Sequence, residues 1–231
     1  MTTRLLGLLG GMSWESTAHY YAYLNRGVRQ ARGGLHSAPL LLHSVDFAAI
    51  ADMQQRGDWA AAAKVLGQAG QGLAAAGAGA LLLCTNTMHK VAAPVAEMAG
   101  IPLLHIADPT IAALHGAGIS RVGLLGTRFT MEDDFYTSRL LAAGLTVCVP
   151  SAADRAEVHR IIFDELCLGQ LHAVSRQRLL GMIDTLRADG AQAVILGCTE
   201  LAMLVGPADT DMPLFDTTAL HGEAALAWLL A

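Results

Sequence analysis

Two stretches of the chain repeat each other and decide how it folds. Residues 77–87, which read GAGALLLCTNT, align without a gap on residues 190–200, which read GAQAVILGCTE. The word GLLG at residues 7–10 recurs at residues 123–126, in the same order and at nearly the same spacing. A four-residue apolar word recurs by chance, but two ordered matches indicate an internal duplication. The sequence therefore predicts two similar lobes.

Short apolar runs without period-two alternation separate longer amphipathic segments, which is typical of parallel strands connected by helices and buried on both faces. The predicted strands are residues 5–9, 38–44, 80–84, 103–106, 122–125, 146–149, 193–196 and 214–215. The predicted helices are residues 16–31, 59–76, 131–143, 175–189 and 220–230, the first with Ser13 as a candidate N-cap. We expect an α/β protein.

The repeat also sets the expected domain limits. Residues 1–115 are predicted to form the first α/β lobe and residues 116–213 the second. Residues 214–231 form a C-terminal strand and helix that we expect to pack back on the first lobe. The expected architecture is two pseudo-symmetric lobes, each a mainly parallel sheet flanked by helices, with a ligand cleft between them.

Composition excludes several classes of protein. Hydrophobic residues make up 53% of the chain and charged residues 15%, which supplies a large core and rules out intrinsic disorder. The net charge of -5 argues against nucleic acid or an anionic membrane as a partner. The apolar stretch at residues 5–12 is too short for a secretory core, and no segment resembles a membrane span. We therefore expect a cytoplasmic protein.

The residues that hold metals and cofactors are also scarce. The four cysteines form no Cys-x-x-Cys pair, and the nine histidines show no metal-ligand spacing, so no metal site is expected. Lys64 and Lys90 are the only lysines, which limits Schiff-base chemistry. No glycine-rich nucleotide motif is present. We expect no cofactor.

Four strand ends carry small and hydroxyl side chains where predicted helices begin, at residues 10–13, 84–87, 126–127 and 197–200. In parallel α/β sheets, ligands bind where strands end and helices begin, and the first N–H groups of a helix can hold an anion there. The sequence predicts a site for a carboxylate or phosphate with contributions from both lobes.

In the aligned repeats, Cys198 corresponds to Thr85, and Cys84 corresponds to Gly197. Titratable groups on either side of a carbon acid can remove a proton from one face and return it to the other. A thiol, with a pKa of about 8.5 that falls at a helix N-terminus, suits this role, whereas a threonine hydroxyl needs help from a neighbour. Cys198 could equally be a packing residue.

The remaining cysteines and two of the histidines have simpler interpretations. Cys148 and Cys167 lie in apolar runs and are expected in the core. His89 and His105 lie near predicted strand ends, where a structural role and a functional role both stay open.

The strand ends resemble the cofactor-independent aspartate/glutamate racemase family. The matching motifs are GGMSWEST at residues 10–17, LCTNTMH at 83–89, LGTRFTM at 125–131 and GCTEL at 197–201, with further likeness at 42–47 and 161–169. The resemblance covers nearly the whole chain. It implies two α/β lobes, a homodimer, an amino-acid substrate held between the lobes, and inversion of Cα without pyridoxal phosphate.

The chain departs from the usual pattern of this family, which has cysteine at both acid–base positions. Keeping Asn86, Thr87 and His89 in register places Thr85 at the first position, with Cys84 one residue early. Neighbouring strand residues point to opposite faces, so both cannot face a ligand without a local bend. The chain resembles the branch with a Thr/Cys pair, which is associated with acidic L-amino acids and with broad-specificity racemases.

The resemblance implies a role for each matching residue. Cys198 and Thr85 would be the catalytic acid–base pair. The substrate-binding residues would be Met12, Ser13, Gln54, Asn86, Thr87, Thr127, Thr199 and Glu200. Most would hold the α-carboxylate and its enediolate through N–H and O–H donors. Gln54 would lie near the side-chain pocket, and Glu200 would hold the ammonium or position Cys198.

The expected function is PLP-independent racemisation of aspartate or glutamate, with other amino acids left open as substrates. Arg56 or Arg128 would receive a second carboxylate, unless both are surface charges. Two alternatives stay open because the first cysteine is lost. One is an amino-acid-binding protein without turnover, and the other is a one-thiol decarboxylase of the same superfamily.

Overall fold

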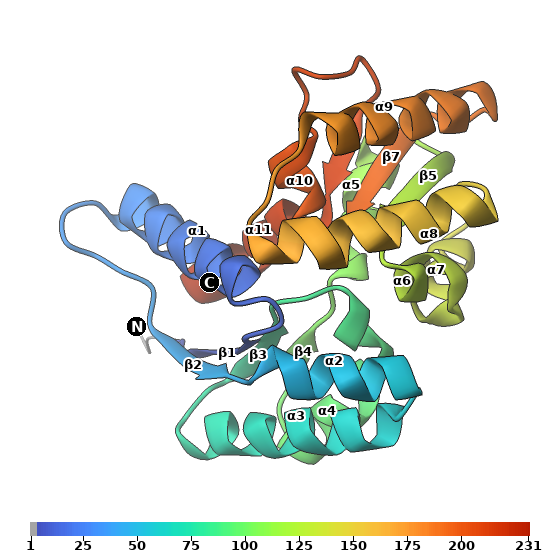
Figure 1. Cartoon of the computed structure of the whole chain (residues 1–231). Coiled ribbons are helices and arrows are strands. Elements are labelled where there is room, and N and C mark those ends of the chain that lie inside the picture. The colour runs from blue at the N-terminus through green and yellow to red at the C-terminus, as the bar shows by residue number, and fades with distance from the viewer. Residues whose placement is uncertain (1–3) are drawn as a thin grey trace. The chain divides into compact units, whose positions relative to one another are not determined.

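The structure is a computed structural model that describes residues 4–231, and these residues form two compact units. The first unit contains Met1–His105 together with His221–Ala231, and the second contains Ile106–Leu220. Each unit has one four-stranded parallel sheet flanked by helices, whose elements are labelled in Figure 1. The predicted α/β class is confirmed.

The sheet of the first unit has the strand order β2-β1-β3-β4. Its strands are β1 (Leu6–Gly10), β2 (Leu40–Ser44), β3 (Ala80–Leu83) and β4 (Leu103–Leu104). The two central strands, β1 and β3, are fully buried, and Leu9 of β1 pairs with Leu83 of β3. Residues that follow these two strands therefore emerge at one edge of the sheet.

The second unit repeats this topology with the strand order β6-β5-β7-β8. Its strands are β5 (Arg121–Gly126), β6 (Thr146–Cys148), β7 (Ala193–Gly197) and β8 (Leu214–Asp216). The repeated word GLLG lies in β1 and β5, and the longer repeat begins before β3 and β7 and runs past their ends. The duplication in the sequence thus corresponds to central strands with the same place in each sheet.

Helices connect the strands within each unit (Figure 1). The longer helices are α1 (Trp14–Arg32), α2 (Phe47–Arg56), α3 (Trp59–Ala75), α4 (Ala92–Ala99), α5 (Ala107–Gly116), α7 (Asp134–Ala142), α8 (Ala152–Arg160), α9 (Ala173–Ala188) and α11 (Thr217–Leu230). The short helical segments are η1 (Thr87–Val91), α6 (Arg128–Glu132), η2 (Ile161–Glu165), η3 (Leu166–Leu168) and α10 (Leu201–Leu204). No described helix is both long enough and apolar enough to cross a bilayer.

Alternating residues of the first sheet pack into two separate cores. Leu8 and Leu82 pack with Tyr20 of α1 and with Leu229 of α11. Residues of the opposite face pack against α2, α3 and α4, including Leu9, Leu81 and Leu83. The second unit has one larger core around β5 and β7. In both units the central strands are held on two faces, so the loops at their ends start from fixed positions.

Two expectations about the elements were wrong. The run at residues 38–44 was expected to be buried on both faces, but β2 lies at a sheet edge and its last three residues are exposed. The helix expected at residues 131–143 is two helices, α6 and α7. Asp133 between them has an extended backbone, with φ -81° and ψ 156°, which stops one helix and starts the next.

Candidate active site

Predicted site residues of the first unit gather where β1 and β3 end. Met12 and Ser13 follow β1, whereas Thr85, Asn86 and Thr87 follow β3. Because the two strands are parallel neighbours, both loops lie at the same edge of the sheet. This is the edge at which ligands bind in parallel α/β sheets.

Hydrogen bonds tie these two loops together. Ser13 caps α1, and its Oγ accepts the N–H of Ser16 at 3.2 Å. The hydroxyl of Ser16 donates to the carbonyl of Cys84 at 3.0 Å. Gly11 makes the turn after β1 with φ +91°, and a Cβ there would lie 2.2 Å from the carbonyl oxygen of Val45, so only glycine fits. The start of α1 is therefore fixed to the end of β3.

The structure separates Cys84 from Thr85. Cys84 has no exposed surface and packs in the core with Leu8 and Leu82, and burial raises the pKa of its thiol. Thr85, the next residue, is partly exposed. The side chain that is available at this strand end is that of Thr85.

Gln54 reaches the same region from α2. Its side chain is buried, and Nε2 donates to Sδ of Met88 at 3.0 Å, just beyond the loop that follows β3. The buried oxygen Oε1 accepts no hydrogen bond from residues 4–231. A buried acceptor without a donor costs about 1–3 kcal/mol, so this oxygen needs a donor from a ligand or water.

The second unit brings its predicted residues together in the same way. Gly126 at the end of β5 pairs with Gly197 at the end of β7. Thr127 follows β5 and caps α6, accepting the N–H of Thr130 at 3.3 Å. Thr199 follows β7, and its hydroxyl lies 2.8 Å from that of Thr218.

The thiol of Cys198 follows the end of β7. Its Sγ donates to Oε2 of Glu200 at 2.8 Å, and Glu200 is itself buried. Burial raises the pKa of the Cys198 thiol well above its ordinary value, and the charges of Glu200 and Cys167 raise it further. The arrangement is a thiol that stays protonated and donates a hydrogen bond to a buried carboxylate.

The helix expected to lower the pKa of Cys198 does not do so. The segment after β7 forms only the four-residue α10, whose N-terminus carries a small dipole. Glu200 places a full negative charge beside the sulfur, and this charge opposes the dipole. Burial first and the Glu200 carboxylate second therefore raise the pKa of the Cys198 thiol.

Among the ten predicted site residues, exposure distinguishes two. Thr85 and Cys198, the predicted acid–base pair, are partly exposed. The eight predicted binding residues are all buried, namely Met12, Ser13, Gln54, Asn86, Thr87, Thr127, Thr199 and Glu200.

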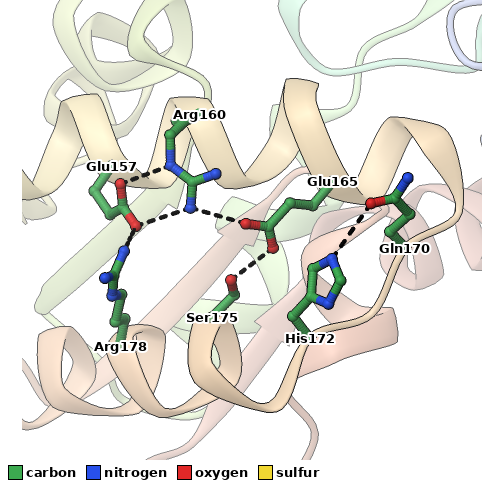
Figure 2. A network of polar contacts seen from close by, with 7 residues as sticks. All are labelled: Glu157, Arg160, Glu165, Gln170, His172, Ser175 and Arg178. Carbon is green, nitrogen blue, oxygen red and sulfur yellow. Dashed lines mark hydrogen bonds and ion pairs between the residues drawn. The ribbon is translucent and has the colours of Figure 1, made fainter.

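A polar network holds the segment that carries Cys167 (Figure 2). Arg160 at the end of α8 contacts both Glu157 and Glu165, and Glu165 also accepts the hydroxyl of Ser175 of α9 at 2.6 Å. Arg178 of α9 pairs with Glu157. These contacts fix η2 and η3 against α9, and η3 contains Cys167.

The arginines that were candidates for a second carboxylate are exposed. Arg56 pairs with Asp52 at 2.6 Å, and Arg128 stacks over the ring of Phe129. Within residues 4–231, no group of three or more metal-ligating side chains is found. Sequence reasoning did not find Met88, Cys167 and Thr218 as neighbours of the site residues.

Two α/β units with the same strand order, a thiol bonded to a carboxylate and hydroxyls at the strand ends fit the racemases, a class of isomerases. Residues 9–225 match the family of Asp/Glu/Hydantoin racemases, and the chain belongs to this family.

Solved structures have the same fold. A crystal structure from Yersinia pestis, provisionally assigned as an Asp/Glu racemase, is 48% identical over 99% of this chain and 100% of that chain, with a TM-score of 0.92. An aspartate racemase homologue from Pyrococcus horikoshii is 29% identical, with 100% of both chains covered and a TM-score of 0.84. The aspartate racemase of Picrophilus torridus is 19% identical over 98% of this chain and 93% of that chain, with a TM-score of 0.73.

Proposed function

We propose that the protein inverts Cα of aspartate or glutamate without pyridoxal phosphate, with Cys198 and Thr85 as the acid–base residues. The observation that carries this proposal is the hydrogen bond from the Cys198 thiol to the buried Glu200 carboxylate. A thiol with a raised pKa needs a base beside it before it can remove a proton, and Glu200 is that base.

The proton transfers follow from these roles. Glu200 accepts the proton of the Cys198 thiol, and the thiolate removes the proton from Cα. The electron pair of the broken C–H bond moves into the α-carboxylate, which becomes an enediolate. The Thr85 hydroxyl delivers a proton to the opposite face of Cα and is reprotonated by solvent, and Glu200 releases its proton to solvent, which restores the starting state. The reverse direction uses the same groups in the opposite order.

The binding residues would stabilise the charge that builds on the carboxylate. The N–H groups at the start of α1, together with the hydroxyls of Ser13, Thr87, Thr127 and Thr199, are donors suited to an enediolate. The buried Oε1 of Gln54 accepts nothing from the described residues, so a substrate ammonium is a fitting donor. Asn86 and Met12 complete the set.

The placement of the lysines supports a mechanism without a Schiff base. The ammonium of Lys90 lies 4.1 Å from the centre of the Trp59 ring, and Lys64 is exposed on α3 beside Trp59. Because Lys64 and Lys90 are the only lysines of the chain and both lie beside Trp59, we propose that the proton transfers need no carbonyl cofactor.

Deuterium exchange tests the function directly. The protein is incubated in deuterated water with each enantiomer of aspartate and glutamate, and then with a panel of other amino acids. We expect deuterium at Cα and conversion of one enantiomer into the other for an acidic amino acid. No exchange and no conversion with any amino acid would refute the proposal.

The single available thiol favours one other function. Because Cys84 is buried in the core, Cys198 is the one partly exposed cysteine at these strand ends, as in a decarboxylase that delivers a proton from one side. Carbon dioxide release from a malonate-like acid, without conversion of amino-acid enantiomers, would establish that alternative. Tight amino-acid binding without exchange, with racemisation gained in Thr85→Cys, would indicate a binding protein.

We also propose that the protein is a cytoplasmic homodimer. The first unit exposes 68% of Trp14, 53% of Tyr21 and 49% of Leu42, which line a groove of about 360 Å³. Apolar patches of this kind mark association surfaces. Light scattering on purified protein is expected to give twice the chain mass, and Trp14→Lys to give the monomer. Cell fractionation tests the compartment.

A further inference from the structure

Three histidines and one tyrosine form a cluster in the first unit that the proposed proton transfers do not use; Tyr20, His89 and His221 are buried and His105 is partly exposed. The ring centroids of His89 and His105 lie 4.7 Å apart, and those of His89 and His221 lie 5.5 Å apart. His221 has no exposed surface, and His89 is 3% exposed. Tyr20 of α1 contacts the edge of the His221 ring.

Hydrogen bonds define the tautomer of His221. A backbone carbonyl only accepts, so Nε2 of His221 carries the proton and donates to the carbonyl of Leu104 at 2.8 Å. Nδ1 of His221 then accepts the hydroxyl of Tyr20 at 2.9 Å. Burial, reinforced by the neighbouring His89, lowers the pKa of His221 to about 3, so its ring is neutral at physiological pH.

The same argument fixes the proton on His89. Its Nδ1 lies 2.8 Å from the carbonyl oxygen of Thr85, so Nδ1 carries a proton and donates it. His89 lies in η1, four residues after Thr85, and the rings of His105 and His221 pack against it. The cluster thus ends on the backbone of the proposed acid–base residue.

We propose that His89 is a positioning residue that sets the orientation of Thr85, and that His221 and Tyr20 hold the His89 ring in place. This inference rests on the proposed function, in which the Thr85 hydroxyl serves one face of Cα. The hydrogen bond from His89 holds the carbonyl of Thr85 in one direction, which fixes the ψ angle of Thr85. The ψ angle in turn sets the direction of the Thr85 side chain relative to the rest of the loop. An error of about 1 Å in such a group can lower a rate about 100-fold.

Two substitutions of His89 distinguish positioning from simple packing. His89→Asn places an amide N–H near the position of Nδ1 and keeps the donor to Thr85. His89→Leu fills similar space without a donor. His36, an exposed histidine outside the cluster, provides the control variant His36→Leu.

The readout is the ratio of enantiomer conversion to Cα–H exchange in deuterated water. We expect His89→Leu to lower conversion about tenfold or more while exchange at the Cys198 face persists, and His89→Asn to behave like the parent. His36→Leu should leave both rates unchanged. Equal loss of conversion and exchange in His89→Leu, or identical behaviour of the Leu and Asn variants, would overturn the inference.

A second measurement keeps the inference separate from the proposed function. Long-range ¹⁵N NMR spectra of the parent should show a proton on Nδ1 of His89 and on Nε2 of His221. The backbone amide shifts of Asn86 and Thr87 should move in His89→Leu and not in His89→Asn. These spectra test whether His89 orients Thr85 even if the parent shows no racemisation. A proton on Nε2 of His89 and on Nδ1 of His221 instead would refute the inference.

If His89→Leu does not fold, Tyr20→Phe provides a milder test of the cluster, because this substitution removes only one oxygen atom. It deprives Nδ1 of His221 of its donor, and we expect a smaller loss of conversion than His89→Leu would cause. An unchanged conversion rate together with an unchanged His221 spectrum would show that Tyr20 does not act on the cluster.

Discussion

Two thiols at equivalent strand ends differ in what surrounds them. Cys84 is buried in the core of the first unit, whereas Cys198 is partly exposed and donates a hydrogen bond to a carboxylate. The aligned repeats pair Thr85 with Cys198 on sequence grounds alone, and the burial of Cys84 supports that register. The assignment of the acid–base residues stays a prediction that the variants below test.

Removing the negative charge of Glu200 should make the thiol more acidic. In Glu200→Gln we expect the pKa of Cys198 to fall, because the carboxylate raises it by charge and as a hydrogen-bond acceptor. Alkylation of Cys198 by iodoacetamide, followed over a range of pH, measures the shift.

The same variant should lose racemisation, because the thiol no longer has a base to take its proton. Cys198→Ala provides the reference for complete loss of exchange. An alkylation profile that moves to higher pH in Glu200→Gln would contradict the proposed role of the carboxylate.

Replacing Cys84 should affect stability and not catalysis. Cys84→Ser places a hydroxyl in an apolar core, so we expect the free energy of unfolding to fall by about 1–3 kcal/mol. Conversion of enantiomers should persist. Urea denaturation measures the first quantity, and Cys148→Ser, in a partly buried strand of the other unit, is the matched control. If exchange is lost in Cys84→Ser but not in Cys148→Ser, the acid–base residue of the first unit is Cys84 and not Thr85.

At the scale of single residues, the sequence revealed contacts between close neighbours and missed distant ones. The N-cap Ser13 lies three residues before its partner, Ser16. Glu200, for which positioning Cys198 was one of two expected roles, lies two residues after it. The contact of Thr199 with Thr218 spans 19 residues, and that of Tyr20 with His221 spans 201. Local pattern carries no information about such pairs.

Strands and helices with a large buried surface could be predicted from the sequence, and those with a small buried surface could not. Each predicted apolar run overlaps an observed strand, because a central parallel strand must be apolar on both faces. Helices with a broad buried face, such as α1 and α3, stand out in the same way. The sequence did not reveal α8, since Val158 is its one buried residue and its other side chains are charged or partly exposed.

The network around Arg160 in Figure 2 predicts a loss of stability in acid. Hydrogen bonds and charge from Arg160 and Arg178 lower the pKa of Glu157 to about 2. Burial alone would raise the pKa of Glu165, but the bonds from Ser175 and Arg160 outweigh it and lower the pKa. Both carboxylates therefore have lower pKa values folded than unfolded, and their stabilisation is present above the unfolded value of about 4.3.

We expect the stability of the second unit to fall as the pH drops from about 4.5 to 2, because both carboxylates must take up protons. Arg160→Met should reduce the free energy of unfolding at neutral pH and flatten its acid dependence, because both carboxylates lose their main cationic partner. Arg187→Met, which removes an exposed pair with Asp184, is the control. Equal acid dependence in the parent and Arg160→Met would contradict this account.

For the whole molecule, the first unit consists of two separate stretches of chain. Residues 221–231 return to the unit formed by residues 1–105, and Ala225 and Leu229 of α11 are buried in its core. The repeat covers only the central strands β1, β3, β5 and β7. The lobe limits expected from the sequence, 1–115 and 116–213, and the expected packing of residues 214–231 on the first lobe stay predictions.

Truncating one side chain of α11 should weaken the first unit selectively. Leu229→Ala leaves a cavity in the core beside β1 and β3, so we expect a loss of about 2–5 kcal/mol in unfolding free energy. Hydrogen exchange should speed up in β1 and β3 more than in β5 and β7. Glu223→Ala, exposed on the same helix, should change neither. Equal loss of protection in both sheets would show that the units unfold together.

The return of residues 221–231 has a consequence for synthesis. A ribosome makes the chain in order, so the residues of the second unit leave the exit tunnel before His221, Ala225 and Leu229 do. Until α11 is made, one apolar face of the earliest-made sheet is covered only in part, by Tyr20, Leu24 and Val28 of α1. In the cell, the oldest part of the nascent polypeptide is therefore the last to be finished, and it is the part that chaperones have most reason to shield.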